Sequence, residues 1–332
     1  MKTIVNDLEG YLSMGKQEHL LFLDQLYILM NKINSDAVDY QTLKAKSTPP
    51  LCPECDSRHI VKNGTQNNQQ VYLCKECGRS FRDSTGTFVY KIHKREKMLD
   101  YIRCMLEGKT LRACAAEVGI SLPTSFAWRH RIITALRSFE DNINFFGVVE
   151  SDELLMQYSE KGRKYKNIKE RIEANKKKKK KVAILATQDR SGNMLFKQFG
   201  LDKVKRVEVE QLLKDKVSGN SVLCIGNNVE FRKLRTNDLK KQQIIVNNDR
   251  QDGLYSLSII QKHKSIFKYW INNKFRGVAT KYLQSYIMWY VIAHKYLLKQ
   301  TIADIGRMLN LASSDRRAWY KYKYLREIKA IF

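Results

Sequence analysis

Proline, acidic residues and long apolar runs are all scarce in this sequence. Only four prolines occur in 332 residues, which favours long helices because proline disrupts a helix interior. No apolar run approaches the roughly 20 residues that a membrane-spanning helix needs. The first residues also lack the continuous apolar core and cleavage site of a signal peptide. We therefore expect a cytoplasmic protein without a membrane partner.

Acidic residues are outnumbered by basic ones, 34 to 60, which gives a formal net charge of +26. So many positive charges repel one another within a compact protein unless a bound polyanion neutralises part of them. Nucleic acid is the leading partner on these grounds, and an anionic membrane surface comes second. Hydrophobic residues make up 43% of the chain, so a buried core can form and wholesale disorder is excluded.

The cysteines are few but unevenly placed, with four of the seven in residues 52–77. They form Cys-Pro-Glu-Cys and Cys-Lys-Glu-Cys pairs separated by 18 residues, a spacing typical of one tetrahedral Zn²⁺ site. Free thiols or disulfides are the competing interpretation. Because all four ligands would be protein sulfurs, the zinc is structural and leaves no position for a reactive water. The predicted ligands of this zinc ribbon, residues 48–90, are Cys52, Cys55, Cys74 and Cys77.

Residues 94–140 carry the signals of a helix-turn-helix domain. One helix ends near Gly108, a second begins after Thr110, and a third begins after Ser121 with Pro123 in its first turn, where the missing N–H costs nothing. Capped helices joined by a glycine-containing turn are typical of this motif, although many helical hairpins bind no DNA. Trp128 fits a core position better than a DNA contact. The residues expected near DNA are Thr124, Ser125, Arg129, His130 and Arg131.

Six consecutive lysines form a second candidate DNA contact, with a solvated loop as the alternative. These residues are Lys176, Lys177, Lys178, Lys179, Lys180 and Lys181.

Residues 146–292 show alternating strand and helix patterns. A short strand ends in a cluster of acids, Glu150, Asp152 and Glu153, which is a plausible but unspecific Mg²⁺ site. Further strands are predicted at 181–187, 193–199, 221–225 and 243–246, and helices at 204–216, 262–275 and 278–298. This order predicts an RNase H-like mixed α/β domain. The whole chain is then multi-domain α+β, with an N-terminal helical segment (1–47), the zinc ribbon, the helix-turn-helix, the RNase H-like domain and a C-terminal helical extension (293–332).

Four segments together resemble a known family. They are CPEC…CKECGRSFRDSTGTFV, TSFAWRHRII, VVESDE and KFRGVATKYLQSYIMWY. In this order they are similar to bacterial insertion-sequence transposases with an N-terminal zinc ribbon, the ISXO-like group, over roughly residues 48–292. The resemblance implies a DDE catalytic domain, in which carboxylates on an RNase H-like core hold two Mg²⁺ ions for phosphoryl transfer.

The resemblance also implies three metal-binding positions, and only one of them is acidic here. The first maps onto Asp152, the second onto Gly226 and the third onto Gln261, with Lys264 where the family places a histidine. Glycine has no ligand atom, and glutamine offers one neutral oxygen. The centre therefore looks degenerate and Mg²⁺ is doubtful. The acids that remain as substitutes are Glu230, Asp249 and Asp252.

Three functions stay open at this point. The first is a DNA-binding protein derived from a transposase, which recognises double-stranded DNA through the ribbon and the helix-turn-helix but lacks a complete nuclease centre. The second is a working Mg²⁺-dependent transposase that cleaves and joins insertion-sequence ends. The third is an RNA-binding or interaction protein that retains only the fold. Enzymatic activity and a homo-oligomeric state are left undecided, and the expected location is a bacterial or phage-type cytoplasm, with the nucleoid.

Overall fold

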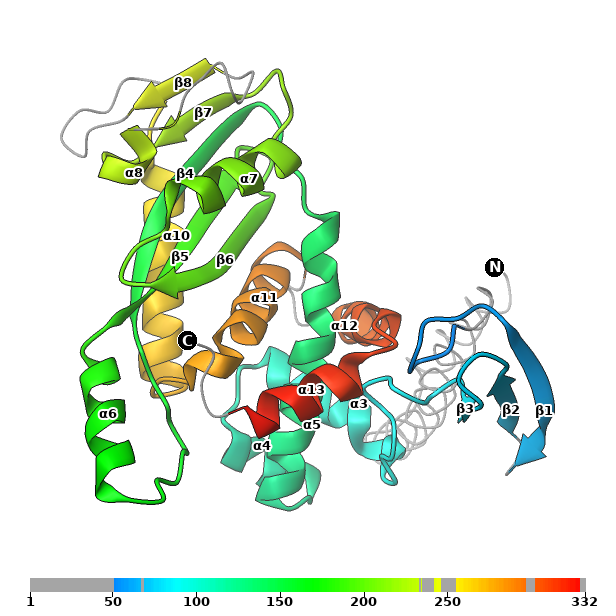
Figure 1. The fold of residues 1–332 in the computed structure, drawn as a ribbon. Coiled ribbons are helices and arrows are strands. Elements are labelled where there is room, and N and C mark those ends of the chain that lie inside the picture. The colour runs from blue at the N-terminus through cyan, green and yellow to red at the C-terminus, as the bar shows by residue number, and fades with distance from the viewer. Residues whose placement is uncertain are drawn as a thin grey trace, which may run out of the picture. The chain divides into compact units, whose positions relative to one another are not determined.

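The computed structural model describes residues 51–66, 69–232, 234, 242–245, 255–296 and 302–328. The predicted N-terminal helical segment, residues 1–47, lies outside the described residues. The chain divides into two compact units (Figure 1). The first comprises Met1–Ser84 with Lys91–Asp100, and the second comprises Thr85–Tyr90 with Tyr101–Phe332.

The first unit contains a three-stranded antiparallel sheet. Its strands are β1 (Ile60–Gln66), β2 (Gln69–Cys74) and β3 (Ser80–Arg82), in the order β1-β2-β3. The buried core of this sheet consists of Cys52, Cys74 and Phe81, with Ile60 and Tyr72 packed against it. A core this small does not supply enough buried apolar surface to hold the fold without a further crosslink.

Three helices lie where the sequence predicted them between residues 94 and 140. A short 3₁₀ turn (Arg95–Lys97) leads into α3 (Met98–Leu106), followed by α4 (Leu111–Val118) and α5 (Leu122–Ala135). The Thr110 and Ser121 hydroxyls each accept a first-turn backbone N–H at 3.3 Å, which satisfies donors that a helix start leaves open. Gly119 ends α4 with a φ of 64°, a conformation that glycine adopts without strain. A second 3₁₀ segment, Leu136–Asn142, extends α5.

The second unit is built on a five-stranded sheet in the order β6-β5-β4-β7-β8. β4 pairs antiparallel with β5 and parallel with β7, β5 pairs antiparallel with β6, and β7 pairs parallel with β8. The five strands lie close to the segments predicted as strands, whereas their order within the sheet was not predicted. The strands are β4 (Val148–Gln157), β5 (Lys181–Asp189), β6 (Met194–Leu201), β7 (Val222–Ile225) and β8 (Gln242–Ile245).

One strand is longer than the sequence predicted. The acids expected just after a strand lie within β4, because β4 stays paired with β5 from Val149 opposite Asp189 to Gln157 opposite Lys181. Strand alternation puts Glu150 and Asp152 on one face and Glu153 on the other. The acidic cluster is therefore divided between the two faces of the sheet.

Helices cover both faces of this sheet. Figure 1 shows α7 in front of the sheet and α10 behind it, and α10 contacts β4 and β5 while α11 contacts β6 and α5. Phe196, Phe267 and Tyr290 join β6, α10 and α11 through ring contacts of 5.0 to 5.9 Å. The helices are α6 (Ile168–Lys178), α7 (Arg206–Lys216), α8 (Val229–Arg232), α10 (Ser258–Tyr269) with a π-helical turn at Trp270–Lys274, and α11 (Thr280–Tyr296).

The C-terminal extension forms α12 (Ile302–Ser314) and α13 (Ala318–Glu327). Both helices pack against α5, and the Trp319 backbone N–H donates to Gly86 O at 2.8 Å. Helix α5 thus packs against α11, α12 and α13, a set of contacts that the helical pattern alone does not reveal. Within the described part of the chain, every helix is too short or too polar to span a lipid bilayer.

Candidate metal centres and nucleic-acid interface

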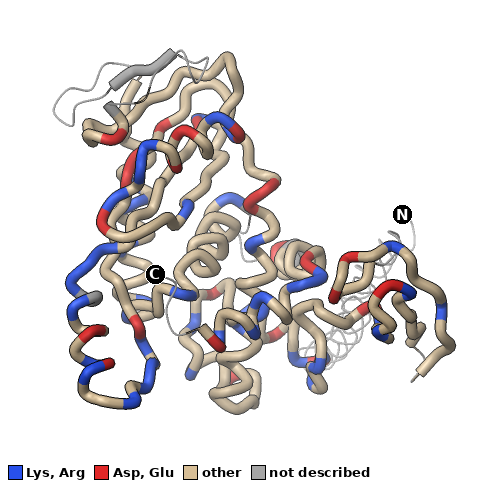
Figure 2. Tube along the Cα trace, in the orientation of Figure 1, with Lys and Arg blue, Asp and Glu red and all other residues tan. Residues whose placement is uncertain are grey.

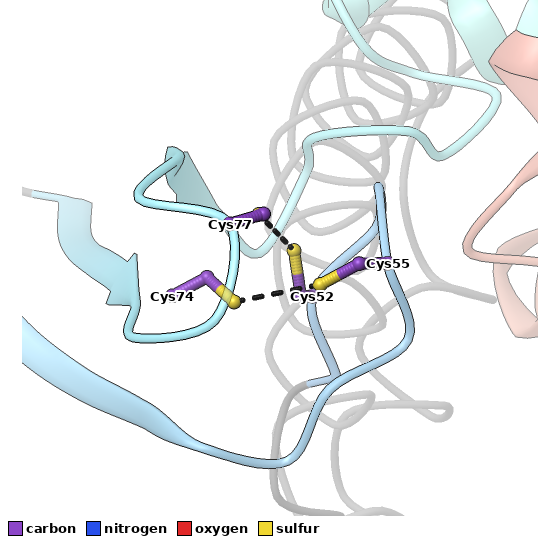
Figure 3. A group of neighbouring side chains, drawn as sticks. All are labelled: Cys52, Cys55, Cys74 and Cys77. Carbon is purple, nitrogen blue, oxygen red and sulfur yellow. Dashed lines mark hydrogen bonds between the residues drawn. The ribbon is translucent and has the colours of Figure 1, made fainter.

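The four ribbon cysteines converge from two separate turns (Figure 3). The sulfur atoms of Cys52 and Cys77 are 3.6 Å apart, as are those of Cys55 and Cys74, and all four lie within 4.8 Å of one another. Four sulfurs at about 2.3 Å from one zinc ion are about 3.8 Å apart in a tetrahedron, whereas a disulfide requires about 2.05 Å. The donor set therefore fits a structural Zn²⁺.

The backbone around Cys74 favours the thiolate that binds a metal. Backbone N–H groups, that of Cys77 first, lower the pKa of the Cys74 thiol to about 6. Two turns close the knuckles, since Asp56 N–H donates to Cys52 O at 2.9 Å and Gly78 N–H donates to Cys74 O at 3.0 Å. Gly78 has a φ of 67°, so a side chain at this position would be strained.

The three positions aligned with the DDE centre lie together in the second unit. The Gln261 side-chain amide on α10 donates to Asp152 Oδ2 on β4 at 2.7 Å. The Lys264 ammonium group forms an ion pair with the same carboxylate oxygen. The side chains of Lys264 and Asp152 are only 12% and 14% exposed, so water screens this pair weakly.

Gly226 closes the other side of Asp152. It follows β7, which runs parallel to β4 with Ser151 opposite Ile225, and its N–H donates to Ser151 O at 3.3 Å. A Cβ at position 226 would lie 2.3 Å from Asp152 Oδ1, closer than nonbonded atoms approach. The present position of the carboxylate therefore depends on glycine at 226.

The neighbouring acids are engaged elsewhere. Glu150 is buried, pairs with Arg190 at 2.9 Å and accepts the Ile260 N–H at 2.9 Å, and burial raises the pKa of its carboxyl group. Glu153 accepts from Val204 N–H at 2.7 Å and from the Asn228 amide at 3.0 Å.

The substitutes considered for the metal site add no ligand next to Asp152 in the described part of the chain. Glu230 pairs with Lys203 at 3.1 Å, and Asp249 and Asp252 lie outside the described residues. Among the described residues, only the four ribbon cysteines bring three or more His, Cys, Asp or Glu ligand atoms within 4.8 Å of one another. A pair of Mg²⁺ ions requires several oxygen ligands, so the described residues around Asp152 do not fit it.

Most side chains expected to touch DNA from α5 are buried instead. Arg129 is fully buried, and its Nη2 donates to Lys109 O at 2.6 Å and contacts Cys114 Sγ at 3.1 Å. His130 is 3% exposed and stacks on Phe126 with ring centroids 4.0 Å apart. Burial lowers the pKa of this imidazole to about 3. Neither side chain can reach a DNA groove in this conformation.

Ser125 and Arg131 are buried as well, whereas Thr124 is partly exposed. The Ser125 hydroxyl donates to Leu111 O at 2.8 Å, and the Arg131 guanidinium lies 4.0 Å from the Trp319 ring centroid on α13. These four side chains are therefore not exposed to DNA in this structure: Ser125 packs against Tyr101 and Leu111, whereas α11 and α13 cover Arg129 and Arg131. Trp128 is buried, as expected, at 4% exposure.

The lysine run is exposed where its side chains are described. Lys176 lies on α6 and Lys181 begins β5, and the side chains of Lys176, Lys179, Lys180 and Lys181 are exposed. Figure 2 shows lysine and arginine gathered along α6 and the segments beside it. The side chains of Lys177 and Lys178 lie outside the described residues. Since the exposed members face solvent, they remain available to a polyanion.

Sequence reasoning missed the contacts around Asp152. Gln261 and Lys264 are three residues apart on α10, so they share one helix face, and this spacing was the available signal. It did not reveal that the Gln261 amide would present its N–H to Asp152. It also did not reveal that Lys264 would take the place expected for a metal cation.

Comparison with known proteins gives one relative in sequence. A stretch of 117 residues, 34% of this chain, is 32% identical to an uncharacterized protein in transposable element ISH50 of Halobacterium salinarum. The match spans 38% of that relative's length. No family model matches the chain.

The solved structures that match include a distantly similar one. A pre-cleavage Mos1 transpososome matches with a TM-score of 0.27 and 9% identity, over 68% of this chain and 78% of that one. A likeness at this level is too weak to define a shared fold.

Proposed function

We propose that this chain is a transposase-derived DNA-binding protein in which an internal ion pair replaces the metal-dependent nuclease centre. The relative from a transposable element supports the origin, and the net charge of +26 supports a polyanionic partner. The five-stranded sheet, with three antiparallel strands followed by two parallel ones, supports an RNase H-like domain. The four segments that resemble the ISXO-like group support the same origin.

One observation carries the loss of catalysis. At the position where a DDE enzyme holds a cation between acids, the Lys264 ammonium group contacts the Asp152 carboxylate, and Gly226 occupies the position of the second acid. An ammonium group fixed on the one remaining acid competes with any divalent ion. It cannot activate a water molecule or a 3′-hydroxyl for in-line attack as a metal does.

DNA binding in this proposal comes from exposed basic surface rather than from buried α5 side chains. The exposed lysines of α6 and the start of β5 supply sequence-independent phosphate contacts, and Thr124 remains a candidate contact at the start of α5. The zinc in the ribbon supplies rigidity and no reactivity, because all four of its ligands would be thiolates.

The test combines binding with chemistry on the same preparation. The purified chain is incubated with duplex DNA and Mg²⁺ or Mn²⁺, and both gel-shift binding and cleavage or strand transfer are measured. We expect salt-dependent binding and no product. Product that disappears with Asp152→Ala would overturn the loss of catalysis, and tighter binding to structured RNA than to duplex DNA at matched salt would overturn the choice of partner.

A further inference from the structure

A cavity of about 980 Å³ lies within the second unit, away from Asp152. Its walls come from the start of α4, the face of α5, the segment after β4, the turn between α10 and α11, and the end of α13. A cavity of this volume is at the upper end of ligand-binding pockets, which measure roughly 300–1,000 Å³. It is far larger than a single inorganic phosphate requires.

The charge of this cavity is strongly one-sided. Eight of its lining residues are lysine or arginine, and two are glutamate. One glutamate, Glu160, is already paired with Arg163 at 2.6 Å. A concave surface with this balance concentrates anions, because its low-dielectric walls focus the field. The basic residues are Arg112, Arg129, Lys161, Arg163, Lys274, Arg276, Lys281 and Arg326.

The rim carries exposed guanidinium groups. Arg112, Arg276 and Arg326 are exposed and form no ion pair with the other described residues. Guanidinium groups bind phosphate oxygens through paired N–H donors. The cavity lining therefore offers three arginine side chains that can bind phosphates.

The wall holds a buried cation that pairs with no acid in the described part of the chain. The Arg129 Nε and Nη1 atoms are buried and hydrogen-bond to none of the described residues. The guanidinium lies 5.7 and 5.4 Å from the ring centroids of Phe275 and Trp289. A buried charge without a counter-ion is costly, and an anion in the adjacent cavity would stabilise it across the low-dielectric wall.

The turn that presents Arg276 is fixed in place. The Lys161 ammonium group donates to the carbonyl oxygens of Phe275, Arg276 and Gly277 at 3.3, 3.0 and 2.9 Å. Arg276 and Gly277 both have positive φ, 51° and 76°. A non-glycine residue in the left-handed conformation is strained, and such residues occur often at functional sites. The turn is thus held in one shape before any ligand arrives.

We propose that this cavity binds the phosphodiester backbone of a nucleic-acid strand. The proposal rests on the proposed function and assigns it a surface that the sequence did not identify. Several cations from different segments around a cavity of about 980 Å³ match a series of phosphates better than one small anion. Phe126 and Phe275, both partly exposed in the lining, add faces on which a base can stack.

The test compares two charge-matched variants of the full-length, zinc-loaded chain. The cavity variant is Arg112→Gln with Arg276→Gln. The control is Lys214→Gln with Lys268→Gln, two exposed residues outside the cavity lining. Affinity for duplex and single-stranded oligonucleotides of equal length is measured by fluorescence anisotropy from about 50 to 300 mM salt, a range over which phosphate contacts weaken markedly. The titrations are repeated with millimolar inorganic phosphate, and circular dichroism confirms folding.

We expect the cavity variant to bind about tenfold or more weakly near 0.1 M salt. Its slope of log affinity against log salt should be shallower by about 1 to 2, as for the loss of one or two phosphate contacts. The control should stay within about twofold. Equal losses in both variants, or displacement of the oligonucleotide by millimolar phosphate, would overturn the cavity assignment alone. If the unmodified chain binds neither oligonucleotide, the proposed function fails first and the cavity assignment with it.

Discussion

The ion pair between Lys264 and Asp152 should stabilise the second unit measurably. Replacing Lys264 by Met keeps the length of the side chain but leaves the Asp152 carboxylate with the Gln261 amide as its remaining polar side-chain contact among the described residues. Asp152→Asn keeps the shape and the ability to accept from Gln261 but removes the charge that faces Lys264. Each single variant thus leaves one poorly compensated group in a site where the two side chains are only 12% and 14% exposed.

The size of the effect follows from this burial. Removing one partner of a buried ion pair typically costs about 3–5 kcal/mol, whereas an exposed pair contributes about 0–1 kcal/mol. Because both side chains are mostly but not fully buried, we expect about 2–4 kcal/mol for each single variant. In the double variant both charges are absent and the hydrogen bond from Gln261 can form, so the loss should be smaller than the sum by about 2 kcal/mol.

Urea denaturation of the wild type, the two single variants and the double variant, followed by tryptophan fluorescence, measures this coupling. Lys262→Met, an exposed position two residues earlier on α10, serves as the control and should change stability by less than about 0.5 kcal/mol. Additive single effects would refute the reasoning, because additivity means that the two charges do not interact. A coupling that vanished in about 1 M salt would show that the pair is exposed rather than buried.

Three further predictions concern other parts of the chain. Gly226→Ala should lower the free energy of unfolding by about 1–3 kcal/mol in urea denaturation, because the new Cβ would lie 2.3 Å from the Asp152 carboxylate. Gly219→Ala, with open space around its Cβ, is the control and should change stability little. Equal effects of the two substitutions would contradict the crowding at Gly226. Cys74→Ser should lose bound zinc in a metal assay and become sensitive to proteolysis within residues 51–84, and a variant that kept both zinc and protection would contradict the metal site. Burial lowers the pKa of His130 to about 3 in the folded chain, whereas the imidazole of the unfolded chain binds a proton near its ordinary pKa of about 6.5. The free energy of unfolding should therefore fall by about 1.4 kcal/mol per pH unit as the pH drops from about 6.5 toward 5. His130→Gln should reduce this slope in urea melts across pH, unlike His93→Gln at an exposed position, and an unchanged slope would exclude a buried neutral imidazole.

Local patterns were sufficient to predict much of the fold. The helix starts at Thr110 and Ser121, and the end of α4 at Gly119, follow from capping chemistry that involves residues within one turn of each other. The positions of the strands along the chain follow from the alternation of short apolar runs and helical periodicity. The four cysteines were predictable because a Cys-x-x-Cys knuckle is a local structure, and only the closure between two knuckles is long-range. The helix α6 was not predicted, since its lysine-rich end has almost no apolar periodicity.

The exposure of α5 could not be predicted in the same way. Its sequence resembles that of a recognition helix, with polar and basic residues after a capped start. Arg129 and Arg131 are nevertheless buried, because α11 and α13 supply aromatic surfaces that accept the two guanidinium groups. Those helices lie far along the chain from α5, so no local pattern reports the contact. The cavity and its rim depend on the same long-range packing.

The sequence by itself determined which chemical groups are present: four thiols with metal-ligand spacing, a large basic surplus, and one acid among the three positions that the family resemblance assigns to a metal site. It also determined the local elements, because capping and periodicity act between neighbouring residues. Only the tertiary structure decided that Lys264, Gln261 and Gly226 all meet at Asp152. The reason is physical: electrostatic and steric effects act over a few ångströms of space, and residues as far as 112 positions apart become neighbours only when the sheet and α10 pack together.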